Sequence, residues 1–258
     1  MHIRYVDRKL YFFEQTFTTQ KYVIPFIQPF LPITENTTVL EIGCGEGGNL
    51  KPFLDRGCSC TGIDISETQI ENAKTFYKDH PQKQNIEFIA SDIYKIDRED
   101  LRFDLIMLRD VIEHIPRQEV FMQFVKKFLK PGGILFFGFP PWQNPFGGHQ
   151  QVCQSKLSKL PYIHLLPVSW YRKLLMKYGE DPSGLLEIKE TGISIERFER
   201  IIHKKKYHVI NKQLYFINPN YEIKFNLKPR KTHPLLAKVP YLRNFYTTAA
   251  YYILELKS

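Results

Sequence analysis

A short apolar segment near the start of the chain runs directly into a glycine-rich turn. Residues 39–42 read Val-Leu-Glu-Ile, and Gly43, Gly45 and Gly47 follow without a break. Glycine lets a backbone bend sharply and approach a ligand closely because it has no Cβ. Residues 49–56 can form a helix after the turn, and the unpaired N–H groups at its start would face an anion. The segment therefore predicts the first strand–turn–helix unit of a nucleotide-binding α/β fold.

Acidic residues end the next two predicted strands. Asp64 ends the strand at 60–65, nineteen residues after Gly45, and Asp92 ends the following one. In nucleotide-binding folds an acid at the first of these places accepts hydrogen bonds from ribose hydroxyls. Gly48 completes the spacing G-x-G-x-x-G, so the turn alone also fits a nicotinamide or flavin cofactor. The remaining segments have to separate these alternatives.

Two further strand-like segments follow at similar intervals. Residues 103–110 read Phe-Asp-Leu-Ile-Met-Leu-Arg-Asp, and residues 129–137 lead from Leu-Lys-Pro through a Gly-Gly turn into an apolar run. Apolar positions at helical spacing over 117–130 predict a helix between them, and Ser66 predicts the cap of an earlier helix. Strands that alternate with helices over residues 37–140 predict a parallel, doubly wound sheet.

Together these segments resemble the class I S-adenosyl-L-methionine (SAM) dependent methyltransferases, most of all the branch of ubiquinone-biosynthesis-type O-methyltransferases. The segments LEIGCGEGGN, GIDIS, ASDI, FDLIMLRDVIEHI and LKPGGILFF stand in that family's order and spacing. The resemblance implies an α/β fold with a Rossmann-like, doubly wound, mostly parallel seven-stranded sheet. It also implies an antiparallel terminal hairpin, a C-terminal cap or insertion, and SAM as the cofactor.

The resemblance assigns one group of residues to the methionine end of SAM. The backbone of Gly43, Cys44 and Gly45 would lie against the methionine part, and Glu41 would support the turn. The main chain of Arg109 would lie near the same end.

A second group would bind the adenosine end. Asp64 would accept hydrogen bonds from both ribose hydroxyls, and Ile65 would pack on the adenine. Asp92 would accept a hydrogen bond from the adenine amine, while the backbone N–H of Ile93 would reach a ring nitrogen. The alternative for both acids is an ordinary role as a helix cap or turn residue.

Histidines are the candidates for proton transfer, because an oxygen acceptor needs a base and the pKa of histidine lies near neutral pH. His149 follows the fifth predicted strand, where an acceptor should arrive, and it equally fits a loop residue bonded to backbone. His114 follows the fourth strand in a Glu-His pair that the family shares, and it fits a structural role better. His164 is the weakest of the three candidates.

Charge divides the chain into two unlike parts. Residues 1–140 carry 17 Lys and Arg against 19 Asp and Glu, whereas residues 141–258 carry 19 against 8. A basic half predicts an anionic partner. The candidates are an anionic small-molecule, lipid or glycan acceptor, RNA, or peripheral contact with a membrane surface; a merely solubilising basic surface is the alternative.

We expect one methyltransferase domain over residues 1–258, with three parts. Its parts are a helical N-terminal cover at 1–36, a SAM-binding core at 37–140, and a lid, basic insertion and terminal hairpin at 141–258. In the last part the sequence predicts helices at 169–178 and 194–204 and the hairpin strands at 212–217 and 249–256.

Neither a signal peptide nor an apolar run of 18 residues is present, so a cytoplasmic location is expected. Four cysteines, Cys44, Cys58, Cys60 and Cys153, lack the paired spacing of a zinc site, and no metal is expected. Buried free thiols are the simpler interpretation.

The sequence favours O-methylation of a small, lipid-linked or glycan-linked anionic acceptor. RNA methylation by the basic half is one alternative, and a catalytically silent SAM-binding partner protein is another. Amino-methylating nucleic-acid enzymes carry a D/N-P-P-Y/F segment after the fourth strand, where this chain has Leu-Arg-Asp-Val. A nucleophilic Pro-Cys segment, as in enzymes that methylate carbon 5 of pyrimidines, is also absent.

Overall fold

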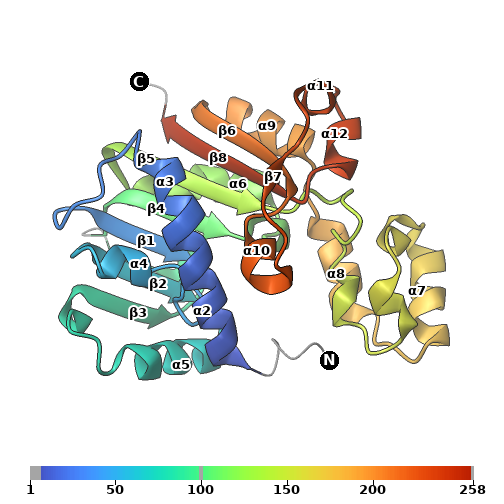
Figure 1. The fold of residues 1–258 in the computed structure, drawn as a ribbon, viewed down its shortest axis with the longest axis horizontal. Helices are drawn as coiled ribbons and strands as arrows, with labels where there is room; N and C mark the ends of the chain where they lie inside the picture. Colours follow the sequence, from blue (N-terminus) through green and yellow to red (C-terminus); the bar gives the residue numbers. More distant parts are fainter. Residues whose placement is uncertain (1–6, 99–100, 257–258) are drawn as a thin grey trace.

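The computed structural model describes residues 7–98 and 101–256. Within these residues, eight strands form one sheet in the order β3-β2-β1-β4-β5-β8-β6-β7 (Figure 1). The strands span Thr38–Ile42 (β1), Ser59–Asp64 (β2), Ile86–Ala90 (β3), Phe103–Arg109 (β4), Leu129–Phe139 (β5), Tyr207–Ile217 (β6), Arg230–Lys231 (β7) and Ala249–Leu256 (β8). The strands from β1 to β5 pair in parallel, and β8, β6 and β7 continue the sheet in antiparallel pairs.

This architecture confirms the expected Rossmann-like, mostly parallel fold. β6 and β8 form the expected antiparallel pair, although a long insertion separates them in the sequence. The sheet has one strand more than the seven expected, because the two-residue β7 pairs with the outer edge of β6. So short an edge strand carries no periodic signal that a sequence could show.

Helices cover both faces of the sheet. The α-helices span Arg8–Thr18 (α2), Ile24–Ile27 (α3), Lys51–Leu54 (α4), Glu67–Tyr77 (α5), Gln118–Phe124 (α6), Val168–Lys177 (α7), Ser183–Thr191 (α8), Ile195–Lys204 (α9), Asn220–Phe225 (α10), Pro234–Ala237 (α11) and Leu242–Phe245 (α12). Short 3-10 turns lie at Lys83–Asn85 (η2), Ile93–Lys95 (η3), Ile112–His114 (η4), Val125–Phe128 (η5), Gln150–Val152 (η6), Lys156–Lys159 (η7) and Ile163–Leu165 (η8). A π-helical turn at Thr19–Val23 (η1) joins α2 to α3.

Alternate residues of the central strands feed two separate cores. In β4, Leu105 and Met107 join a core with α2 to α5, while Ile106 and Leu108 join a core with α6 and α9. Successive side chains of a strand point to opposite faces, so a strand that is apolar throughout must be covered on both sides. This explains why β4 reads as a continuous apolar run.

Helix caps follow the sequence where the signal is local. Ser66 caps α5 by accepting a hydrogen bond from the N–H of Gln69, at 3.4 Å, and Ser194 caps α9 in the same way. Two other helices differ from the prediction in their bounds. Only Lys51–Leu54 of the segment 49–56 is helical, and the helix expected at 169–178 begins one residue earlier, with Pro167 at its cap position.

Residues 150–186 contain a small core of their own. Cys153, Leu157, Tyr171 and Leu175 pack together there with two leucines of α8, a helix that the sequence did not predict. In Figure 1 this part, with α7, lies apart from the sheet. Within residues 7–98 and 101–256, no helix combines the length and the apolar character needed to cross a bilayer.

The strand order places the site before any residue role is considered. The order of the parallel strands reverses between β1 and β4, since β2 and β3 lie on one side and β5 on the other. In open α/β sheets a ligand binds in the crevice outside the carboxyl ends of the strands at such a reversal.

Candidate functional site

A cavity of about 440 Å³ lies at the carboxyl ends of β1, β4 and β5. Gly43 and Gly45 line it from the turn after β1, and Arg109 and Asp110 line it from the end of β4. His149 closes it from the loop after β5. The structure therefore brings the glycine turn, Arg109 and His149 together.

The glycine turn has a backbone that only glycine adopts easily. Gly43 and Gly45 have φ of +70° and +54°, and a Cβ at Gly43 would lie 2.5 Å from Cγ2 of Val111. The amides of Gly43 and Cys44 donate to the carbonyl of Ile63, at 2.8 and 3.2 Å. These two amides, and that of Gly45, are therefore used within the protein.

Asp64 joins the turn to the end of β2. Its Oδ2 accepts the N–H of Gly45 at 2.8 Å, and its Oδ1 accepts the N–H of Ser66 at 2.9 Å. Each carboxylate oxygen has a further lone pair. Asp64 can therefore hold the turn and still accept hydrogen bonds from the ribose hydroxyls of a nucleoside.

Glu41 lies buried behind the turn. Its Oε1 accepts a hydrogen bond from Nδ2 of Asn49 at 2.6 Å, and Oδ1 of Asn49 accepts one from Arg109 at 2.7 Å. Burial raises the pKa of Glu41 to about 8. The chain Glu41–Asn49–Arg109 supports the turn from below, as the sequence predicted for Glu41. Arg109 takes part through its side chain, which the prediction did not include.

None of the four predicted adenosine-binding residues lines the cavity, and Asp64 has been described above. Ile65 lies at the end of β2 with 79% of its surface exposed, so its apolar side chain is open to a flat ligand. Asp92 accepts the N–H of Tyr94 at 3.0 Å as the cap of η3, and Ile93 is buried. Their strands are nevertheless neighbours, and the N–H of Ser91 donates to the carbonyl of Asp64 at 2.9 Å. The three residues lie beside the cavity along the same edge of the sheet.

The two candidate histidines meet at the cavity. The ring centroids of His114 and His149 are 4.9 Å apart, with the planes at 79°. Burial lowers the pKa of His149 to about 4, with a smaller contribution from the nearby His114 and His164, and desolvation also lowers the pKa of His114. Both rings are therefore neutral at pH 7, and each has a nitrogen lone pair to offer.

A tightly bonded loop holds His149 in place. His149 itself has φ of +56°, and the following Gln150 is fully buried with its amide donating to the carbonyl of Pro145 at 2.9 Å. Nε2 of His164 lies 2.8 Å from the carbonyl oxygen of Trp142. His164 is thus a structural residue of the loop.

Sequence reasoning missed several residues of the cavity wall. Glu113 is 2% exposed, and Gln15 reaches the cavity from α2; neither oxygen of Glu113 nor Oε1 of Gln15 has a hydrogen-bond partner among the described residues. Asp110 lies next to them with φ of +56°. The sequence could have indicated Glu113, because this residue stands beside His114 in the Glu-His pair. Gln15 had none, since only tertiary packing brings α2 to the turn.

The N-terminal helix and the basic insertion form the outer wall. Arg8 of α2 pairs with the buried Glu46 through two hydrogen bonds, of 2.6 and 2.5 Å. Glu222 of α10 accepts hydrogen bonds from Tyr22 and Lys21, the latter at 2.9 Å. These contacts fasten α10 to the N-terminal helical stretch beside the cavity.

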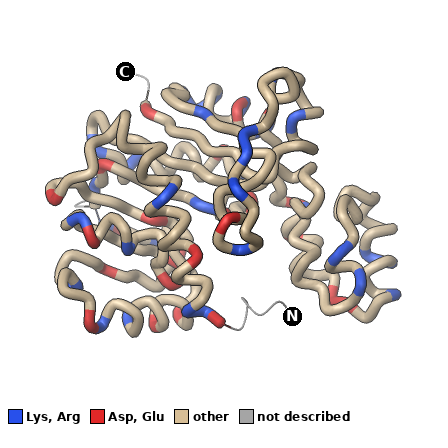
Figure 2. The backbone as a smooth tube through the Cα atoms, in the orientation of Figure 1, with Lys and Arg blue, Asp and Glu red and all other residues tan. Residues whose placement is uncertain are grey.

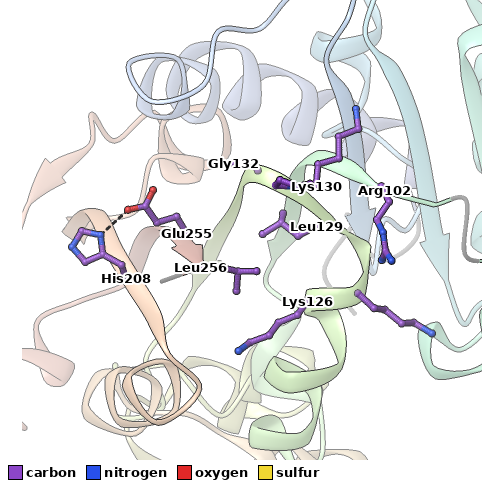
Figure 3. Close-up of a pocket in the computed structure, with 11 residues that line it drawn as sticks. Arg102, Lys126, Leu129, Lys130, Gly132, His208, Glu255 and Leu256 are labelled. Atoms are coloured by element: carbon purple, nitrogen blue, oxygen red, sulfur yellow. Dashed lines mark hydrogen bonds and ion pairs between the residues drawn. The ribbon is translucent and has the colours of Figure 1, made fainter. Parts of the chain in front are cut away.

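A second, larger cavity of about 900 Å³ lies where β4 and β5 begin (Figure 3). Two of its lysines are engaged: Lys126 donates to the carbonyl of Lys205 at 2.6 Å, and Lys130 pairs with Asp104 at 2.9 Å. In Figure 3, Lys126 and Lys130 point away from each other. This cavity lies at the opposite end of the strands from the glycine turn, so it does not belong to the same site.

The residues around the smaller cavity fit SAM. Asp64 has spare acceptor capacity for a ribose, Ile65 offers an exposed apolar surface, and Gln15 has an unpartnered acceptor in the wall. A Cβ at Gly45 would stand 3.1 Å from Oε1 of Gln69 and would narrow the cavity there. A nucleoside with a cationic, amino-acid-bearing end fits these donors and acceptors.

Known proteins that are similar to this chain carry the same domain. Residues 40–137 match a family described as a methyltransferase domain. A ubiquinone biosynthesis O-methyltransferase from Coxiella burnetii is 34% identical over 99 residues, which are 38% of this chain and 42% of that protein. The chain thus spans less than half the length of the curated relatives it matches.

Solved structures share the fold at low identity. A plantazolicin methyltransferase in complex with SAH superimposes with a TM-score of 0.56 at 14% identity, covering 96% of this chain and 84% of that one. Geranyl diphosphate C-methyltransferase from Streptomyces coelicolor, in complex with Mg²⁺, geranyl diphosphate and S-adenosyl-L-homocysteine, gives 0.58 at 12% identity, with 91% and 78% covered. The strand order and the family match agree, and residues 40–137 therefore form a methyltransferase domain of the class I type that uses S-adenosyl-L-methionine.

Proposed function

We propose that this chain transfers the methyl group of SAM to a hydroxyl oxygen of a small, anionic acceptor. The observation that carries the proposal is the shared cavity. The glycine turn that would hold SAM, and His149, which would face the acceptor, line the same hollow of about 440 Å³. Two reactants held in one cavity react as if in a single molecule.

The chain's own residues would position the two reactants. SAM supplies the activated methyl group, so the protein has to bind, orient and desolvate. Asp64 would fix the ribose, and the turn at Gly43–Gly45 would lie along the methionine part. The outer wall formed by α2 and α10 would exclude water from the acceptor.

His149 is the candidate for the proton of the acceptor hydroxyl. Its ring is neutral at pH 7, and the bonded loop after β5 fixes its position. A pKa as low as about 4 makes a weak base. His114, 4.9 Å away between ring centroids, would support His149 rather than replace it.

The size and charge of the cavity support a small anionic acceptor. A volume of about 440 Å³ lies in the range of small-molecule sites. Arg8, Arg109 and Lys224 line it, against the acids Asp110 and Glu113. A lipid-linked or glycan-linked anion would place only its head in this space, and we expect the reaction to take place in the cytoplasm.

RNA methylation is the second candidate, and the excess of Lys and Arg over residues 141–258 favours it. Figure 2 shows these cations spread over separate elements of that half. RNA binding needs a continuous basic track along a phosphate backbone. The cavity of about 440 Å³ supports the small acceptor better.

Transfer of labelled methyl from SAM into a fractionated cell extract tests the proposal. Label in small-molecule, lipid or glycan fractions is the expected result, and the labelled fraction identifies the acceptor class. Label confined to RNA would instead support the second candidate, for which binding should also weaken steeply with salt. SAM binding without transfer to any fraction would leave a silent SAM-binding partner protein as the better description.

A further inference from the structure

Three side chains of metal-ligand type meet at the inner end of the cavity. One oxygen of Glu113 and one ring nitrogen each of His114 and His149 all lie within 4.8 Å of one another. Glu113 and His114 come from η4, directly after β4, and His149 comes from the loop after β5. The pairing of β4 with β5, with Arg109 opposite Gly138, brings these segments to the same edge of the sheet.

The carboxylate of Glu113 is a second, independent indication of a ligand in this cluster. Its side chain is 2% exposed, and neither carboxylate oxygen has a hydrogen-bond partner among residues 7–98 and 101–256. It lines the cavity together with Asp110. A buried carboxyl group without a partner costs several kcal/mol unless it stays protonated or meets a cation.

We propose that Glu113, His114 and His149 bind one divalent transition-metal ion of the zinc class. A cation would satisfy the carboxylate of Glu113, and the two neutral imidazoles would complete three protein ligands. Three protein ligands with an open fourth position are the arrangement of catalytic zinc sites. The open position would face the cavity, because Glu113 and His149 line it.

The donor set and the spacing fit such an ion after a small movement. Ligand atoms on one tetrahedral zinc ion lie about 3–3.5 Å apart, because each is about 2.0–2.2 Å from the ion. The three atoms, which lie within 4.8 Å of one another, need to approach by up to about 1–2 Å. His114 is exposed enough to turn. Two imidazoles and a carboxylate favour zinc-class ions, whereas Mg²⁺ and Ca²⁺ prefer oxygen ligands.

The site revises two expectations from the sequence. The absence of a metal was inferred from the cysteines, all four of which are buried and free, but histidine and glutamate provide the ligands here. His149 becomes a ligand rather than a base. An ion would then hold and polarise an oxygen of the acceptor, a role that rests on the proposed function, whereas binding of the ion does not.

Zinc binding by the metal-free full chain tests the site directly. We expect one equivalent of Zn²⁺ to be taken from a chromogenic chelator. Glu113→Gln and His149→Asn should each weaken binding at least tenfold, since asparagine tolerates the positive φ of His149 but lacks the imidazole. The matched control is His203→Ala on the exposed surface of α9, which should bind zinc like the parent.

Cobalt gives a second readout that reports the ligands themselves. Co²⁺ bound at this site should show visible absorption, which His149→Asn abolishes and His203→Ala preserves. Melting temperatures show which variants are folded. His114→Ala, at an exposed position, keeps the test valid if Glu113→Gln does not fold.

Two results would overturn the proposed metal site. One is that the parent protein binds no stoichiometric zinc. The other is that the folded Glu113, His114 and His149 variants bind zinc as tightly as the parent. SAM binding and methyl transfer are measured separately. Zinc bound at the site in a chain that never transfers methyl would leave the site standing and remove the proposed function. If the chain binds no zinc and still transfers methyl in the presence of a chelator, the proposed function would stand and the metal site would be removed.

Discussion

The two cavities lie at opposite ends of the same strands and differ in what their polar groups do. The larger one, of about 900 Å³, is strongly basic, yet Lys126, Lys127 and Lys130 all donate to protein acceptors, and His208 pairs with Glu255 (Figure 3). The smaller one has about half the volume and a mixed charge. It alone of the two includes Glu113 and Gln15, with buried oxygens that lack partners among the described residues.

This difference distinguishes a ligand-binding site from a surface cavity that binds no ligand. Buried polar groups are nearly always hydrogen-bonded, so an unpartnered one in a cavity wall is available to a ligand. Volume and net charge do not carry that information, because surface cations are easily satisfied by nearby carbonyls. Substitutions at the smaller cavity are therefore expected to lower SAM affinity or turnover, whereas substitutions at the larger cavity are not.

The largest effect should come from His149. His149→Asn should lower turnover by about 10²–10⁴-fold with little change in SAM affinity, whether the imidazole takes a proton or holds an ion. Label transfer to the acceptor fraction measures turnover, and calorimetry measures SAM affinity. Unchanged turnover in the folded variant would reduce His149 to a loop residue.

The second-largest effect should come from Asp64. Asp64→Ala should weaken SAM binding by roughly 1–3 kcal/mol, because charged hydrogen bonds to the ribose are lost. Glu87→Ala is the control, since Glu87 on the neighbouring β3 makes only an exposed ion pair with Arg98, at 2.9 Å. Equal SAM affinity in the two variants would remove the assignment of Asp64.

Opposite pH profiles should distinguish the two ends of the sheet. The pKa of Glu41 is about 8, so the folded chain keeps a proton that the unfolded chain has lost above its ordinary value of 4.5. The free energy of unfolding contributed by Glu41 therefore falls as pH rises from about 4.5 to about 8. Glu41→Gln should raise stability at pH 8 by on the order of 1 kcal/mol and much less at pH 5.

Asp104, at the larger cavity, should behave in the reverse way. Burial opposes its charge, but hydrogen bonds from Lys130 and Thr38 outweigh burial and lower its pKa. Its contribution is present above the unfolded pKa and is lost as pH falls through the folded one. Denaturant unfolding of Glu41→Gln between about pH 4 and 8, and of Asp104→Asn between about pH 2 and 5, measures both slopes. Parallel slopes would contradict the contrast between the two ends.

The smallest effect is expected at the basic cavity. Lys126→Met keeps an aliphatic side chain near the ring of Tyr207 and removes both the charge and the hydrogen bond to the carbonyl of Lys205. SAM affinity and turnover should stay within about twofold of the parent, since a solvent-accessible charge so far from the reactants contributes little. A large loss of turnover would show that this cavity takes part in acceptor binding and would break the comparison.

Much of the fold could be predicted because its signals are local. The last strand begins and ends where expected, at Ala249 and Leu256, and Ser66 caps α5 as predicted. The predictions failed where tertiary packing overrides propensity. The helix after the glycine turn shrinks to Lys51–Leu54, because the preceding residues turn to place Asn49 against Glu41.

The candidate site divides in the same way. The glycines and Asp64 follow strand ends, and parallel strands bring such residues to one edge whatever the details. His149 was found, but only as an isolated histidine. Its contact with His114, and the unpartnered carboxylate of Glu113, required the loop after β5 to fold back over η4.

The sequence by itself determined the parallel sheet, the reversal of strand order near the glycine turn, and the acid that faces the turn. These features follow from local signals, namely the periodicity of apolar residues and the residues at strand ends. Only the tertiary structure decided which hollow is the site and which ligands share it. Glu113 and His149 are separated by α6, η5 and β5, and their meeting depends on the pairing of β4 with β5 and on long-range packing that no local pattern records.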